Sequence, residues 1–230
     1  MIKFYLLKDR ELELRDDTYV KKVITDIWDN LPLLIMGDVI FMVFCVPWFI
    51  FFLAGLNMLS LWCIVLINPA FAGLMYLAGK IAKGKACNIK DLFFGIYRFF
   101  RRALIIGLLT VFLLFVTIWT FKLIEANPEQ RWLIIPWVFQ LSCLIFMGVL
   151  HVHIFPIMTL YDADLKTVFI SSIALAVKYK LHTIGMVSLI ILMALLIRLI
   201  WIGLIIVVPG VLAVFMSNLT LLLMRKYQHK

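Results

Sequence analysis

Six apolar runs, each long enough to cross a lipid bilayer, occupy most of this 230-residue chain. A transmembrane helix needs about 20 consecutive residues that are mostly apolar. The expected spans are residues 31–54, 57–79, 103–124, 132–158, 184–207 and 209–225. Hydrophobic residues make up 65% of the chain and the mean hydropathy is +1.08, whereas soluble domains are roughly 45–50% apolar. The sequence therefore predicts an all-α, polytopic membrane bundle with six transmembrane helices.

The last apolar run is the shortest of the six. The run from Gly210 to Arg225 has only 16 residues, which is close to the lower limit for a helix that crosses a bilayer. Residues 209–225 are therefore either a short span or a re-entrant arm. The Pro209-Gly210 pair predicts a tight turn immediately before this run.

Three amphipathic segments are expected to form helices that lie at the membrane surface. They cover residues near 17–29, 88–101 and 164–180. Each has apolar residues at helical spacing on one side and charged or polar residues on the other, a pattern that suits the headgroup interface. Asn88 and Asp164 are good N-cap residues for the second and third of these helices.

The second and third amphipathic segments also begin alike, which indicates an internal duplication. Asn88-Ile-Lys-Asp-Leu-Phe93 and Asp164-Leu-Lys-Thr-Val-Phe169 each lie between two apolar runs. The repeat units would cover about residues 57–124 and 132–207. Both units run in the same direction through the membrane, so the predicted repeat is direct, unlike the inverted repeats of many transporters.

The distribution of Lys and Arg predicts the orientation of the chain. With the N-terminus inside, 19 of the 22 basic residues lie in cytoplasmic segments, as the positive-inside rule requires. Residues 1–30 would then be a cytoplasmic N-terminal segment, residues 31–225 the membrane domain and residues 226–230 a cytoplasmic tail. We interpret the net charge of +9 as membrane topology, with no nucleic-acid partner, because no soluble basic module is present.

Three segments resemble the YesL-like family of uncharacterised bacterial integral membrane proteins. They are Gly37-Asp-Val-Ile-Phe-Met-Val-Phe-Cys-Val-Pro47, Asn68-Pro-Ala-Phe-Ala-Gly-Leu-Met-Tyr76 and Phe155-Pro-Ile-Met-Thr-Leu-Tyr-Asp-Ala-Asp-Leu-Lys166. The resemblance covers roughly residues 30–224 and implies a six-span fold in the bacterial inner membrane. It also implies an accessory role beside carbohydrate uptake systems. The molecular activity of the family is unknown.

Four polar side chains are expected at a similar depth in four different spans. Counted at 1.5 Å per residue, Arg198, Gln140, Asn218 and Asn68 lie about 12–16 Å from the outer ends of their spans. An ionisable residue inside a membrane span is a functional hypothesis by default. The layer either lines a cavity for an anionic or sugar-like ligand, or it joins helices structurally. The structural interpretation is the favoured one.

Two further groups are candidate sites on the cytoplasmic side. Asp38 and His151 are expected near the same end of their spans and could form a pair, although structural hydrogen bonding is the favoured role. No metal site follows from His151 and His153, which are two residues apart and point in different directions on a helix. The expected lipid or partner contacts are Lys90, Arg98, Arg101 and Arg102.

The sequence favours a protein that is not an enzyme. It contains no Gly-rich phosphate loop, no ordered Ser/His/Asp set and no paired-carboxylate motif, and it implies no cofactor. The predicted function is an accessory or assembly partner of a carbohydrate uptake system, with the lipid bilayer and a second copy of the chain as further partners. The alternatives are a small transporter or channel at Arg198 and, less favoured, an enzyme of lipid substrates.

Overall fold

The computed structural model describes residues 16–200 and 207–228, and the fold below refers to these residues. Its helices are α1 (Asp16–Asp29), α2 (Leu31–Leu53), α3 (Asn57–Ala82), α4 (Ile89–Ala126), the short 3-10 helix η1 (Arg131–Leu133), α5 (Ile134–Tyr161), α6 (Leu165–Lys178), α7 (Lys180–Ile200) and α8 (Val208–Gln228). The described part of the chain contains no strand. The prediction of an all-α bundle is confirmed.

Six of these helices are long and apolar enough to cross a membrane: α2, α3, α4, α5, α7 and α8. Because an apolar helix satisfies its backbone hydrogen bonds internally, it is one of the few structures that can cross hydrocarbon. The chain is therefore a multi-pass membrane protein by length and composition. The turn between α2 and α3 includes Gly55, whose φ of +72° is costly for other residues.

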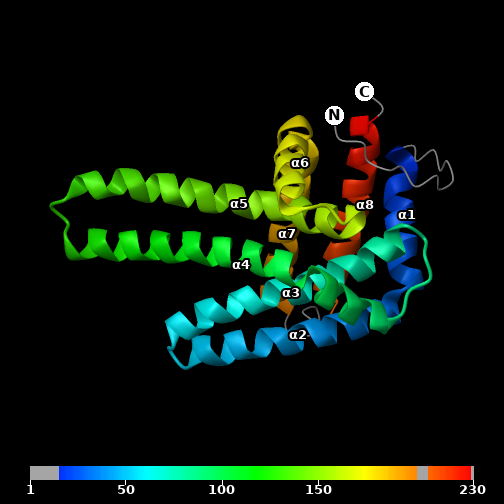
Figure 1. The fold of residues 1–230 in the computed structure, drawn as a ribbon, viewed down its shortest axis with the longest axis horizontal. Helices are drawn as coiled ribbons and strands as arrows, with labels where there is room; N and C mark the ends of the chain where they lie inside the picture. Colours follow the sequence, from blue (N-terminus) through cyan, green and yellow to red (C-terminus); the bar gives the residue numbers. More distant parts are fainter. Residues whose placement is uncertain (1–15, 201–206, 229–230) are drawn as a thin grey trace.

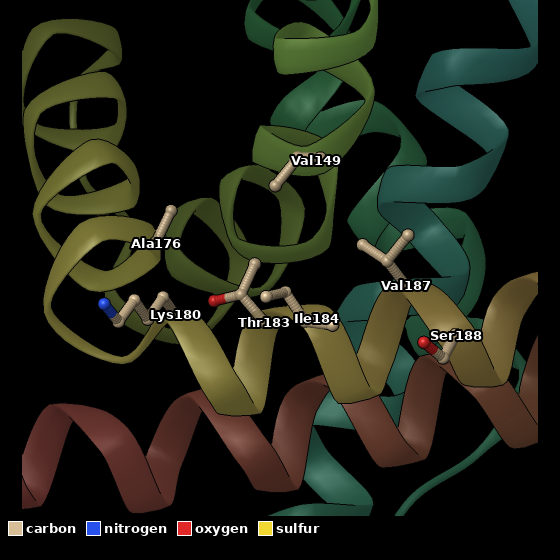
Figure 2. A pocket seen from close by; sticks show the side chains of 7 residues that line it. All are labelled: Val149, Ala176, Lys180, Thr183, Ile184, Val187 and Ser188. Atoms are coloured by element: carbon tan, nitrogen blue, oxygen red, sulfur yellow. The ribbon is translucent and has the colours of Figure 1, made fainter.

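The long helices form hairpins around α3. The α2–α3 and α4–α5 pairs point in the same direction, and the α4–α5 pair extends further from the rest of the molecule (Figure 1). Helices α7 and α8 run across this direction, since the close view that looks along α5 shows both of them from the side (Figure 2). In the most apolar 18-residue stretch of each helix, 56% of the residues of α3 and 67% of those of α8 are buried, against 11% for α5. The core therefore lies around α3 and α8.

Glycines allow α3 and α4 to pack closely. A Cβ atom added to Gly95 would lie 2.7 Å from Cβ of Tyr76 and 3.1 Å from Cα of Gly73. A Cβ atom on Gly73 would lie 2.7 Å from the carbonyl oxygen of Leu92. Small residues at helix contacts in membranes let backbones approach in this way.

The second of the three predicted amphipathic helices is not a separate element, which corrects the prediction for residues 88–101. These residues form the beginning of α4, a single helix of 38 residues. The first and third predicted helices are present as α1 and α6, and their position at the membrane surface stays a prediction. Tyr179, with φ −116° and ψ 45°, separates α6 from α7, whereas no residue near position 102 interrupts α4.

Both predicted N-cap positions are found at helix starts. Asn88 precedes α4, and its backbone N–H donates to Asp91 Oδ2 at 2.9 Å. Asp164 precedes α6 and accepts a hydrogen bond from the backbone N–H of Thr167 at 3.3 Å. Such bonds satisfy donors that the first turn of a helix leaves unpaired. The direct repeat itself stays a prediction.

Pro209 and Gly210 lie inside α8, so the predicted turn before this helix is wrong at these residues. Both belong to the first turn of α8, which begins at Val208. Proline suits the first turn because its missing N–H would have no partner within the helix there. A proline-glycine pair is therefore compatible with the start of a helix at this position.

Candidate functional site

Asn68 lies at the contact between α3 and α4. Its side chain is 9% exposed and its Nδ2 donates to the carbonyl oxygen of Ile64 at 3.0 Å. A Cβ atom added to Gly107 on α4 would lie 2.8 Å from Asn68 Nδ2. Asn68 therefore packs between two helices and bonds to its own helix, which is a structural role.

Asn218 belongs to a different polar cluster, formed with α1 and the end of α3. Lys22 Nζ donates to Asn218 Oδ1 at 2.8 Å, to Asp26 Oδ2 at 2.8 Å and to the carbonyl oxygen of Ala82 at 2.9 Å. Asn218 Nδ2 also donates to Asp26 Oδ2 at 3.2 Å. This cluster, which we call the α1 clasp, ties the N-terminal amphipathic helix to α8 and α3.

The structure separates two members of the predicted polar layer. Asn218 is linked through Lys22 to Ala82, and Asn68 lies 14 residues before Ala82 on the same helix. At 1.5 Å per residue the two amides are about 21 Å apart along α3. The prediction that they share one layer is therefore wrong, because α8 does not run parallel to the α2–α3 and α4–α5 pairs (Figure 1).

The other two members of the layer lie on α5 and α7. Gln140 is partly buried, and its Oε1 has no hydrogen-bond partner among the described residues. The backbone of Arg198 belongs to α7, but its side chain lies outside the described part of the structure. No described contact joins either residue to the two asparagines.

Asp38 and His151 have other hydrogen-bond partners. Asp38 is fully buried and its Oδ2 accepts from the backbone N–H of Gly210 at 3.0 Å, which links α2 to α8. His151 Nδ1 lies 2.7 Å from the carbonyl oxygen of Met147, and Nε2 lies 3.4 Å from Thr110 Oγ1 on α4. The described hydrogen bonds therefore do not join the candidate pair.

The predicted lipid or partner residues divide into two groups. Arg98 Nη2 donates to Asp162 Oδ2 at 2.6 Å, and Arg102 Nη1 donates to Asp162 Oδ1 at 2.7 Å. Burial alone raises the pKa of the Asp162 carboxyl, but these hydrogen bonds outweigh burial and hold the pKa below its ordinary value. Lys90 and Arg101 are exposed on the same helix. Two arginines thus join α4 to the end of α5.

A basic groove lies beside this ion pair. Its cavity of about 210 Å³ is lined by residues from α3, the loop after it, α4 and the end of α5. The charged residues in the lining are Lys80, Lys83, Lys85, Arg98 and Asp162. We call this cavity the basic groove. Asp162 and the three lysines were not predicted as a site. The sequence signal for a polar position there is the end of the apolar run at Tyr161, which Asp162 follows directly.

A second cavity, of about 180 Å³, lies between α5, α6 and α7 (Figure 2). Its walls are mostly apolar, and Lys180 lies at one end (Figure 2). Thr183 lines this cavity. Its Oγ1 lies 3.0 Å from His153 Nε2 and donates a hydrogen bond to the carbonyl oxygen of Tyr179. None of the predicted site residues lines it, and its polar groups are not arranged as a catalytic set.

The described residues contain no group of His, Cys, Asp or Glu that could hold a metal ion. The fold and its apolar surfaces define a multi-pass α-helical membrane protein. Comparison with protein-family models, curated proteins and solved structures finds no significant match. Membership of the YesL-like family therefore stays a prediction that rests on the three sequence segments.

Proposed function

We propose that this chain is a non-enzymatic assembly partner of another membrane protein, and that its α4–α5 hairpin is the element that binds the partner. The observation that carries the proposal is the extension of this hairpin beyond the α2–α3 pair (Figure 1). One side of α5 bears six exposed residues at helical spacing. These residues, which we call the hairpin stripe, are Ile135, Val138, Phe139, Ser142, Ile145 and Phe146.

The composition of the hairpin stripe suits a contact between helices. Large apolar side chains gain little by moving from lipid to protein, so helix association in membranes depends on close packing. Ser142 within the stripe and Gly148 beside it are small and exposed, and a Cβ atom on Gly148 would meet nothing within 4 Å. These positions leave room for a second helix to approach α5.

The resemblance to the YesL-like family favours a subunit of a carbohydrate uptake system as the partner. The same resemblance favours the bacterial inner membrane as the location of the protein. The excess of Lys and Arg in the expected inner segments supports an orientation with both termini in the cytoplasm. In this orientation the turn between α4 and α5 faces outward. A transporter site at Arg198 gains no support, because Asn68 and Asn218 belong to separate contacts.

Photocrosslinking in the native membrane tests the assembly role. A benzophenone amino acid replaces Phe139, which is 70% exposed on the hairpin stripe, or Phe52, which is 54% exposed on α2. We expect a protein adduct from position 139 and none from position 52, because only the first lies on the proposed contact. The mass of the adduct separates a transport subunit from a second copy of this chain. Equal adducts from both positions, or lipid adducts alone, would contradict the proposal.

A further inference from the structure

We propose that the basic groove binds a phosphate group, and that a phosphate-bearing lipid headgroup is its source. Among the described residues, the groove and its edge bring together five cations and two carboxylates, a formal excess of three positive charges. The cations are Lys80, Lys83, Lys85, Arg98 and Arg102, and the carboxylates are Asp91 and Asp162. This inference does not depend on the assembly role of the hairpin.

Hydrogen bonds to the framework of the groove hold Lys80, Lys83 and Arg98 in place. Lys80 Nζ lies 2.8 Å from Asp91 Oδ2, and Arg98 lies 2.6 Å from Asp162. Lys83 Nζ donates to the carbonyl oxygen of Leu160 at 2.6 Å, at the end of α5. Cations fixed in this way lose little conformational entropy when an anion binds. The volume of about 210 Å³ is well above the roughly 30 Å³ that a water molecule occupies in the liquid.

The depth of the groove favours a lipid over a free ion. Helix α4 has 38 residues and is therefore about 57 Å long, far more than the roughly 30 Å of bilayer hydrocarbon. The apolar run from residue 103 to residue 124 accounts for about 33 Å of this length. Arg98 lies five residues before this run, or about 7.5 Å outside it. The headgroup layer is roughly 5–7.5 Å thick on each side, so the backbone of Arg98 lies at its outer limit and the side chain can reach the phosphates.

The composition of the first turns of α4 also suits the level of the lipid headgroups. Tyr97 is 86% exposed and Phe93 is 53% exposed, and both lie within five residues of Arg98 along α4. Aromatic side chains are enriched at the boundary between hydrocarbon and headgroups, where one part of the ring system is apolar and the other is wet. These residues therefore support the placement of Arg98 at the level of the headgroups.

Binding of defined lipids to the full-length chain in a neutral detergent tests the proposal. The probes are dioleoylphosphatidic acid and dioleoylglycerol, which differ only in the phosphate, and the readout is native mass spectrometry. The groove variant is Lys83→Gln with Lys85→Gln. The control variant, Lys90→Gln with Arg101→Gln, removes two positive charges from the same region outside the groove lining. Thermal unfolding of each variant shows whether it is folded.

We expect phosphatidic acid to bind the wild type more tightly than dioleoylglycerol. The groove variant should lose roughly tenfold or more in this affinity, because two charge-assisted contacts are weakened, and the control should change less than twofold. If the double variant does not fold, Lys85→Gln alone, at an exposed position, should still lower the affinity.

The same preparation distinguishes the two sources of phosphate. Stabilisation of the wild type by phosphatidic acid but not by millimolar inorganic phosphate identifies a lipid headgroup as the ligand. Stabilisation by inorganic phosphate, lost in the groove variant, identifies a phosphate site that takes the free ion. Equal loss of lipid binding in the groove and control variants, or equal binding of the two lipids, would overturn the proposal.

Discussion

At the scale of single residues, the α3–α4 contact depends on two glycines that face each other. The Cα of Gly73 would lie 3.1 Å from a Cβ atom on Gly95, and Cβ of Tyr76 would lie only 2.7 Å from it. Backbone and Cβ atoms cannot move as the end of a flexible side chain can. Any larger residue at Gly95 must therefore push the two helices apart.

The replacement Gly95→Ala tests this contact, with Gly148→Ala as the control. We expect Gly95→Ala to cost about 1–3 kcal/mol of stability through overpacking, which outweighs the gain of up to about 1 kcal/mol from helix propensity. Gly148 has nothing within 4 Å of an added Cβ atom, so Gly148→Ala should be neutral or slightly stabilising. Thermal unfolding in detergent measures both. Equal stability of the two variants would show that α3 and α4 are not in close contact.

At the scale of secondary structure elements, the helix starts are easier to predict than the helix ends. The caps at Asn88 and Asp164 were predictable because their side chains or the following acidic residue satisfy free N–H groups. The continuity of α4 could not be predicted, because residues 88–101 have the amphipathic pattern of a separate surface helix. The break at Tyr179 lies between two lysines with no adjacent proline or glycine, so no local breaker marks it.

The distance between spin labels at Lys90 and Lys122 tests the continuity of α4. Both lysines are exposed and 32 residues apart on the helix. A continuous helix places their Cα atoms about 48 Å apart, and we expect a single narrow distance distribution near this value in pulsed electron paramagnetic resonance. A distribution centred well below it would mean that a surface helix meets the span at an angle near residue 102.

At the scale of the whole molecule, the class of protein was predictable and the relative positions of its helices were not. Six apolar runs are a property of the sequence, because each run must meet hydrocarbon on its own. The predicted polar layer failed because depths counted along separate helices are comparable only if the helices are parallel. Since α8 crosses the α4–α5 direction (Figure 2), Asn218 meets Lys22 on α1.

The same geometry links the two proposals. The basic groove lies where α3 ends and α4 begins, and the turn between α4 and α5 lies at the far end of the extended hairpin (Figure 1). Both proposals require the hairpin to cross the bilayer, with the groove at one membrane surface and the turn at the other. This placement is the central claim.

Labelling of single cysteines in intact cells tests that claim most directly. In a chain whose four native cysteines are replaced, one cysteine is introduced at Lys85 in the groove or at Glu129 in the α4–α5 turn, both exposed positions. We predict that a membrane-impermeant maleimide labels position 129 from outside and labels position 85 only after the membrane is opened. Labelling of both positions from the same side would contradict a membrane-spanning hairpin.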